Sequence, residues 1–278
     1  MKKLAGVVIL YNPPEEVYDN IMTYYPYLDW LFVLDNSEKI NEDLVCKIKQ
    51  LSNVKYICHG ENKGIAYSLN EALKLCNDKF EWLLTMDQDS SFKDGMLDGY
   101  IRCLDNLDIN VYGIASARRE AESSRGKLVL INHCITSGNI IRVKIAIAVG
   151  GFDENLFIDE VDNEFCYRCN AHGYLLLKYQ RKIMNHALGT PTTFTMFGGG
   201  ITKHFSMHNH IRYYYFIRNR LYVMSHYPEI RWHYLYVIIK DIIKIFFCNE
   251  DRMKKFKYSF KGYKDFKHNR MGKLIDKE

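Results

Sequence analysis

Short apolar runs alternate with amphipathic segments through the first half of this 278-residue chain. The apolar runs have the length and composition of buried strands, and the segments between them have helical periodicity. The predicted strands are Leu4–Leu10, Trp30–Leu34, Val54–Ile57, Trp82–Met86 and Val111–Ser116. The predicted helices are Glu15–Tyr25, Glu42–Leu51, Ile65–Cys76 and Met96–Leu104. This alternation predicts an α/β fold in which helices cover both faces of a largely parallel sheet.

The second half is less regular up to a run of three glycines. Gly198-Gly199-Gly200 breaks the pattern, and we place a boundary there. Residues 1–200 are predicted to form the α/β domain, and residues 201–278 a mostly helical C-terminal region. Within the first part, Asp162–Ala171 is predicted as a helix that carries Cys166 and Cys169. The eight scattered cysteines lack a second Cys-x-x-Cys pair, so they are typical of reduced thiols in a cytosolic protein.

The N-terminus has only a superficial likeness to a secretory signal. The apolar stretch after Lys2-Lys3 has seven residues and lacks a small-residue cleavage site. A first strand explains Leu4–Leu10 better, and no stretch reaches the length of a transmembrane helix. We expect a cytoplasmic protein.

Positive charge is concentrated at the C-terminal end. The net charge is +5, yet Arg231–Glu278 holds 13 Lys and Arg against 6 Asp and Glu, a balance of +7, so residues 1–230 sum to −2. A helical wheel over the tail places Lys240, Lys244, Asp251 and Lys255 on one side. It places Ile239, Ile242, Ile243, Phe246 and Phe247 on the other. This pattern suits a helix at the inner face of the cell membrane, or one packed on the catalytic domain with a basic outer face.

Two carboxylates follow the fourth predicted strand. In Asp87-Gln88-Asp89 the acids stand at i and i+2, so strand geometry points both in one direction. Mg²⁺ takes one or two carboxylates and completes its coordination with water and phosphates. Tyr11-Asn12 and Asp35-Asn36 also follow strands, and ligands of parallel sheets bind beyond that edge. The alternative is an acidic turn that caps the next helix.

Several segments share their order and spacing with one enzyme family. They are Asp35–Ser37, Glu61–Ala66, Leu84–Ser90, Gly151–Phe165, Asn185–Gly189 and the run His210–Asn219. Over residues 4–220 the chain resembles the family 2 glycosyltransferases of GT-A fold, in their rhamnosyltransferase-like branch. The resemblance does not extend to the end of the tail.

The resemblance implies a donor site and a metal site. The substrate-binding residues it implies are Tyr11, Asn12, Asp35, Asn62, Gly64, Asp87, Gly138, Arg212 and Arg218. Asp35 would bind the nucleobase or ribose, and the two arginines would face the diphosphate or an acidic acceptor. The metal ligands it implies for Mg²⁺ or Mn²⁺ are Asp87, Asp89 and His186. On their own, His186 would be a structural histidine, and the arginines would fit a solvated basic face equally well.

The resemblance also implies one catalytic base. An inverting transferase needs a carboxylate opposite the leaving group, which takes the proton of the attacking acceptor hydroxyl. Asp162 is the choice, and Asp159 is the chief rival because the family often shows two adjacent acids where this chain has Val161-Asp162. Glu164 fits a helix-start carboxylate equally well.

The leading interpretation is therefore a metal-dependent inverting glycosyltransferase. It would move L-rhamnose from dTDP-L-rhamnose to a hydroxyl of a glycan, often lipid-linked, in synthesis of cell-surface polysaccharide such as O-antigen or capsule. A UDP-hexose or UDP-galactofuranose donor is the alternative within the class. A nucleotidyltransferase would need a basic or glycine-rich triphosphate loop, which Tyr11-Asn12-Pro13-Pro14 is not. A non-catalytic sugar- or nucleotide-binding protein is the third interpretation, and no nucleic-acid motif is present.

Overall fold

The computed structural model describes residues 3–117, 128–186, 191–196, 201–206, 208–247 and 251–275. The chain divides into two compact units at His186. Unit 1 is Met1–His186 with Lys277–Glu278, and unit 2 is Ala187–Asp276. Residues 197–200 lie outside the described ranges, so the predicted boundary at residue 200 stays a prediction.

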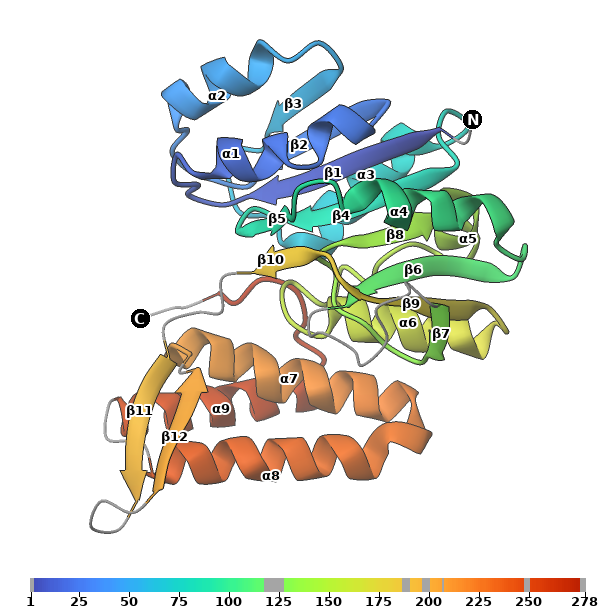
Figure 1. Cartoon of the computed structure of the whole chain (residues 1–278). Coiled ribbons are helices and arrows are strands. Elements are labelled where there is room, and N and C mark those ends of the chain that lie inside the picture. The colour runs from blue at the N-terminus through green and yellow to red at the C-terminus, as the bar shows by residue number, and fades with distance from the viewer. Residues whose placement is uncertain are drawn as a thin grey trace. The chain divides into compact units, whose positions relative to one another are not determined.

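Unit 1 is built around an eight-stranded sheet in the order β3-β2-β1-β4-β8-β6-β9-β7 (Figure 1). Strands β1, β2, β3 and β4 are mutually parallel, whereas β8 runs antiparallel to both β4 and β6. The strands are β1 Leu4–Leu10, β2 Trp30–Asp35, β3 Val54–Cys58, β4 Trp82–Asp87, β6 Val111–Ala117, β7 Leu128–Ile131, β8 Asn139–Arg142 and β9 Leu175–Lys182. The predicted α/β class and the five predicted strands are confirmed.

Six α-helices of the described part accompany this sheet. They are α1 Val17–Met22, α2 Glu42–Lys49, α3 Ile65–Cys76, α4 Leu97–Arg102, α5 Val143–Ala148 and α6 Val161–Ala171, with 3₁₀ turns η1 Tyr25–Tyr27 and η2 Cys103–Asn106. All four helices predicted between the strands form, although α1 and α4 are shorter than expected. A small antiparallel pair, β5 Ser90–Phe92 and β10 Met184–His186, completes the unit.

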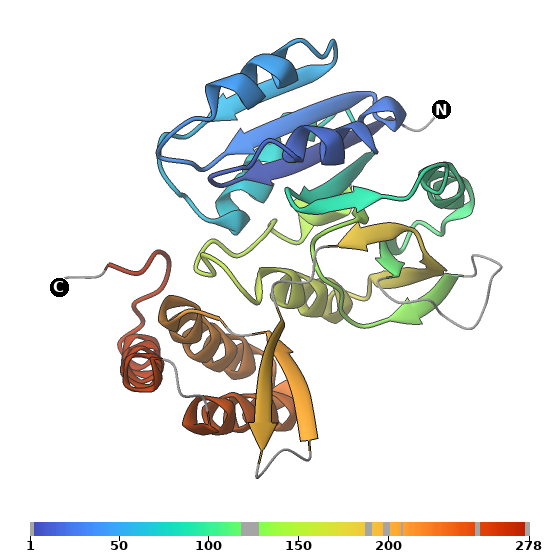
Figure 2. The ribbon, with the colours of Figure 1, turned by 60° about the vertical axis from the view of Figure 1, so that its left-hand side comes forward.

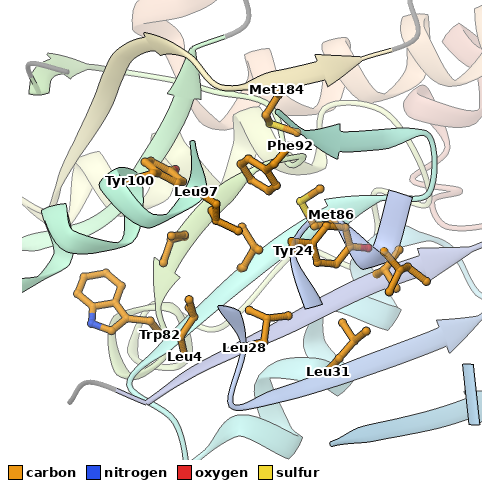
Figure 3. Close-up of a cluster of buried hydrophobic side chains, with 14 of the residues drawn as sticks. Leu4, Tyr24, Leu28, Leu31, Trp82, Met86, Phe92, Leu97, Tyr100 and Met184 are labelled. Carbon is orange, nitrogen blue, oxygen red and sulfur yellow. The ribbon is translucent and has the colours of Figure 1, made fainter. Parts of the chain in front are cut away.

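The core follows from the alternation of side chains along the strands. Leu4, Val8 and Leu10 of β1 point to one face, where they join buried residues of α1, α2 and α4. Figure 3 shows part of this cluster, with Leu97, Tyr100, Phe92 and Met184 gathered over the sheet. On the opposite side α3 buries its own apolar stripe. Figure 2 shows the ribbon from a second direction. Both faces are covered, so ligand access is left to the strand ends.

Unit 2 has a hairpin and three long helices. The hairpin joins β11 Pro191–Met196 to β12 Ile201–Ser206. The helices are α7 His210–His226, α8 Arg231–Phe247 and α9 Arg252–Lys267, with the 3₁₀ turn η3 Pro228–Ile230 before α8. A Cβ on Gly262 would overlap the carbonyl of Tyr214, so α7 and α9 pack with their backbones close together. The mostly helical prediction holds from residue 210, but β12 was missed.

The helical wheel of the tail was wrong in its extent. It placed residues from Ile239 to Lys255 on one helix, whereas α8 ends at Phe247 and Asp251 precedes a separate α9. Lys255 is buried, with its ammonium over the ring of Tyr213 at 5.9 Å. None of the helices in the described ranges combines the length and the apolar character needed to cross a bilayer.

Candidate active site

The carboxyl ends of β1, β2 and β4 lie level at one edge of the unit 1 sheet. In the parallel register Leu10 pairs with Asp35, and Ile9 pairs with Asp87. The predicted segments Tyr11-Asn12, Asp35-Asn36 and Asp87-Gln88-Asp89 therefore come together at this edge, as expected for a ligand site of a parallel sheet.

Asp35 is held rigidly at the end of β2. Its carboxylate is buried and accepts hydrogen bonds from the backbone N–H of Ser37 at 2.9 Å and from the hydroxyl of Tyr56 at 2.7 Å. Burial and the adjacent carboxylate raise the pKa of Tyr56, so this phenol stays a donor. A carboxylate oxygen has a second lone pair, so Asp35 retains capacity to accept from a ribose or base.

Gln88, between the two acids, ties the Tyr11 loop to β4. Its Oε1 accepts from the N–H of Tyr11 at 2.8 Å, and its Nε2 donates to the carbonyl of Tyr11 at 3.1 Å. The next residue, Asn12, has a left-handed φ of 46° and donates its N–H to Ser37 Oγ at 2.8 Å. These bonds fix the loop that the sequence predicted near the nucleotide, and sequence reasoning gave Gln88 no role.

A polar network of Asn36, His59 and Glu71 lies next to Asp35 and Gly64. Asn36 Nδ2 donates to the carbonyl of Gly64 at 3.3 Å, which turns its Oδ1 toward His59 Nδ1 at 2.7 Å. The other ring nitrogen of His59 lies 2.6 Å from Glu71 Oε2. Both ring nitrogens of His59 thus lie within hydrogen-bond distance of a side-chain oxygen, one from Asn36 and one from Glu71. The sequence analysis missed His59, although its position directly after a predicted strand was a usable signal.

Gly64 must be glycine. It has a φ of +88°, and a Cβ there would meet the Phe157 carbonyl oxygen at 2.6 Å. Asn62 Oδ1 accepts from the Gly64 N–H at 3.0 Å, and Ile65 N–H donates to Phe157 at 3.0 Å. Through this contact the segment that follows Phe157, which contains Asp159 and Glu160, begins beside the start of α3.

Asp89 lies exposed two residues after the end of β4, and Ser90 Oγ donates to its Oδ1 at 3.3 Å. In the β5–β10 pair His186 stands opposite Ser90, so its backbone is adjacent to Asp89. The His186 side chain is outside the described part of the structure. Among the described residues no group of three or more His, Cys, Asp or Glu side chains is placed to hold a metal ion. A pair of carboxylates nonetheless suits Mg²⁺, which draws most other ligands from water and phosphate.

One loop links Asp87 to Asp162. The backbone N–H of Asp87 donates to Ser137 Oγ at 3.2 Å, and the N–H of Thr136 donates to Asp162 Oδ2 at 3.1 Å. Gly138, with a φ of +78°, continues the loop and donates its N–H to Thr85 at 2.8 Å. The predicted metal ligand and the predicted base therefore contact adjacent residues of the same loop.

Asp162 is the second residue of α6, and its Oδ1 accepts from the N–H of Asn163 at 2.9 Å. Burial, followed by the negative charge of Glu160, raises the pKa of Asp162 to about 7. A base poised near neutrality is what proton abstraction from a hydroxyl requires. Before it, Asp159 and Glu160 both have left-handed backbones, with φ of 63° and 64°. Such strain in non-glycine residues is typical of functional loops.

Glu164, also in the first turn of α6, is engaged elsewhere. It is buried and paired with Arg168 at 2.6 Å, which leaves it a structural partner.

The two predicted arginines lie on α7 in unit 2. Arg212 is half-buried with its guanidinium over Phe216 at 5.6 Å. Arg218 is fully buried, donates to the Tyr214 hydroxyl at 3.1 Å and the Gly272 carbonyl at 2.8 Å, and anchors the C-terminal segment to α7. These contacts are structural, and the predicted role of Arg218 in donor binding stays a prediction. The neighbouring Tyr213, Tyr214 and Tyr215 are buried as well.

Comparison with known proteins shows similarity over the part of the chain that holds the candidate site. A model of Glycosyl transferase family 2 matches residues 15–164, more than half of the chain. The chain belongs to this family. The matched range includes Asp35, the Asp87–Asp89 pair and Asp162. The dTDP-rhamnosyl transferase RfbF of Shigella flexneri is 26% identical over 237 residues, which are 78% of this chain and 78% of RfbF.

Solved structures share the fold at low identity. GalNAc-T7, solved with UDP, GalNAc and Mn²⁺, superposes with a TM-score of 0.57 and 13% identity over 67% of this chain and 44% of its own. TarS of S. aureus gives a TM-score of 0.50 and 16% identity over 67% of this chain and 37% of its own. The chain thus spans less than half the length of either. These neighbours confirm the predicted GT-A type fold of this glycosyltransferase.

Proposed function

We propose that this glycosyltransferase moves L-rhamnose from dTDP-L-rhamnose to a hydroxyl of a glycan acceptor, with inversion at the anomeric carbon. The similarity to the S. flexneri dTDP-rhamnosyl transferase supports the donor. A lipid-linked glycan of a cell-surface polysaccharide is the proposed acceptor.

The strand ends of unit 1 would hold the nucleoside diphosphate. Asp35 would accept from the ribose or base, beside the loop that Gln88 fixes. Asn62 and Gly64 present backbone close to the same edge, where a glycine lets a ligand approach.

Asp87 and Asp89, with His186 on the neighbouring strand, would hold Mg²⁺ or Mn²⁺. Oxygen ligands at an exposed edge fit a hard cation shared with a diphosphate. When bound, the ion supplies neutralisation of the charge on the departing diphosphate. The Mn²⁺ in the GalNAc-T7 structure supports a divalent ion for this fold.

Asp162 would take the proton from the acceptor hydroxyl as that oxygen attacks the anomeric carbon. The hydroxyl oxygen forms the new glycosidic bond, the bond to the diphosphate breaks, and the proton passes to the Asp162 carboxylate. The N–H groups of Thr136 and Asn163 orient this carboxylate. The observation that carries the proposal is the loop Thr136-Ser137, which contacts both Asp162 and Asp87.

A donor panel tests this proposal. The purified chain is incubated with dTDP-L-rhamnose, UDP-glucose or UDP-galactofuranose and a glycolipid extract, and release of nucleoside diphosphate is measured. We expect turnover of dTDP-L-rhamnose ahead of the UDP-sugars, with an inverted linkage by NMR. Turnover of a UDP-sugar alone would contradict dTDP-L-rhamnose as the donor. Retention of configuration at the anomeric carbon would contradict the role of Asp162 as the base of an inverting reaction.

A further inference from the structure

Helix α8 has apolar residues on its outward face as well as on its inward face. Its inward face includes Tyr234, Ile238 and Ile245, but also Asp241, which is paired with Arg220 at 2.6 Å and Lys244 at 2.8 Å. The inward face of α8 therefore packs through apolar side chains and through the ion pairs of Asp241.

The outward face of α8 is a continuous apolar stripe. Its central members, spaced by four and three residues, are all between 50% and 80% exposed: Trp232, Tyr236, Ile239, Ile243 and Phe246. This spacing places them along one side of the helix. Ile242 adds a further exposed residue at the edge. Contiguous exposed apolar surface of this kind marks an interaction site. We call these six residues the α8 stripe.

The surroundings of the α8 stripe are basic. Unit 2 holds 16 Lys and Arg against 6 Asp and Glu, a balance of +10, whereas unit 1 holds 22 against 27, a balance of −5. The exposed Arg231 and Lys240 flank the stripe on α8 itself. Asp241 is the one acid in the sequence of α8, and it points inward to its two cations. The outward surface of α8 thus presents apolar and cationic groups with no carboxylate.

We propose that the α8 stripe binds the surface of an anionic lipid bilayer. Trp, Tyr and Phe favour the headgroup boundary, aliphatic side chains enter below it, and flanking cations meet acidic headgroups. Lipid complements both the apolar stripe and its charged border. A second copy of this chain would match the apolar residues alone, since it would bring two basic units together.

The inference changes which residues of the tail matter. The sequence pattern combined the apolar side of the wheel with the summed charge of Arg231–Glu278, but that sum includes Lys255, which is buried. The α8 stripe and its border are instead the contact surface, and the exposed Lys254 and Lys257 add only long-range attraction.

Vesicle co-sedimentation of the full chain tests the proposal without any need for turnover. We expect binding to phosphatidylcholine vesicles that contain phosphatidylglycerol, weaker binding to pure phosphatidylcholine, and a blue shift of Trp232 fluorescence on binding. The double variant Ile239→Asp, Ile243→Asp should bind at least about tenfold more weakly, because it places carboxylates in the centre of the stripe. Ile109→Asp, at a 76% exposed position in unit 1, is the matched control and should bind like wild type.

Three outcomes would overturn the proposal. If the double variant co-sediments with anionic vesicles as strongly as wild type, the α8 stripe does not bind the bilayer. A lipid-free dimer in analytical ultracentrifugation that the double variant abolishes, with no vesicle binding by wild type, would assign the stripe to a second copy. A large fall in Tm for the double variant but not for Ile109→Asp, again without vesicle binding, would assign it to packing within the chain.

Discussion

The two units treat their charged groups in opposite ways. Unit 1 gathers carboxylates where strands end, with Asp89 exposed and Asp162 half-buried near Glu160. Unit 2 turns key ionic groups inward, as with Arg218 and the Asp241 ion pair, and turns apolar side chains outward on α8. We propose that the acidic unit receives a ligand and a cation, whereas Arg218 and Asp241 of the basic unit hold its helices together.

The contrast shows that a buried charge has a role only through its partners. Asp35 and Arg218 are equally buried. Asp35 is held by the strand-end residues Ser37 and Tyr56 at the open edge of a sheet. Arg218 is held by Tyr214 and Gly272, which belong to the packing of α7 against the C-terminal segment. Substitutions at the strand ends of unit 1 should therefore reduce activity or donor binding, whereas substitutions at buried ionic groups of unit 2 should reduce stability.

The largest effect is expected at Asp162. Asp162→Asn keeps the size of the side chain but removes its basicity, so kcat should fall by ~10²–10⁴-fold while donor affinity is retained. Steady-state kinetics and calorimetry measure the two quantities. Asp159→Asn is the matched control. Wild-type turnover in Asp162→Asn beside an inactive Asp159→Asn would move the base to Asp159.

The same variant should be more stable than wild type at alkaline pH. The pKa of Asp162 is raised to about 7 in the folded chain, so the folded state binds more protons than the unfolded state between about pH 4 and pH 7. The wild-type free energy of unfolding therefore falls as pH rises through this window. The gain in Tm of Asp162→Asn over wild type should be full at pH 8 and small at pH 4.

Arg218 should matter for stability and leave donor binding unchanged. Arg218→Met leaves the Gly272 carbonyl without its donor, and we expect a loss of roughly 2–4 kcal/mol in the free energy of unfolding. Arg212→Met, at a half-buried position on the same helix, should cost less than ~1 kcal/mol. Loss of dTDP affinity in Arg218→Met at unchanged Tm would instead make Arg218 a diphosphate ligand.

Two glycines near the predicted donor site allow the cost of a positive φ to be measured apart from the cost of a steric clash. Both Gly60 and Gly64 have positive φ, but a Cβ meets nothing within 4 Å at Gly60 and strikes Phe157 at Gly64. Gly64→Ala should lose about 2–3 kcal/mol and raise the donor KM, whereas Gly60→Ala should lose about 1 kcal/mol with KM unchanged. Thermal unfolding and donor titration compare the two. Equal behaviour would mean that the Gly64–Phe157 contact does not shape the site.

The smallest effect is expected from Glu160. Its charge contributes to the raised pKa of Asp162, so Glu160→Gln should lower that pKa. Activity requires ionised Asp162, and the acidic limb of the kcat profile should therefore move to lower pH, by roughly half a unit. A limb that stays in place would mean that Glu160 does not reach the base electrostatically.

Sequence periodicity predicted the parallel strands and the meeting of Tyr11, Asp35 and Asp87, because buried strands have a strong local signal and their ends share an edge. It could not predict the His59–Glu71 support of Asn36, which depends on contacts between helix α3 and the residues that follow β2 and β3. The helical wheel also could not decide which side of α8 faces outward, because it does not reveal that Asp241 pairs with Arg220. The bond between Arg218 and the Gly272 carbonyl also has no local signal in the sequence, since the two residues lie 54 positions apart.

The central claim is that the sheet edge of unit 1 binds a nucleoside diphosphate together with a divalent cation. Calorimetry of dTDP binding, with and without Mg²⁺ or Mn²⁺, tests it most directly in wild type and in Asp89→Ala. The account predicts strong binding only with metal in wild type, and loss of that metal dependence in Asp89→Ala at unchanged Tm. Equal dTDP affinity of the wild-type chain with and without metal would contradict it.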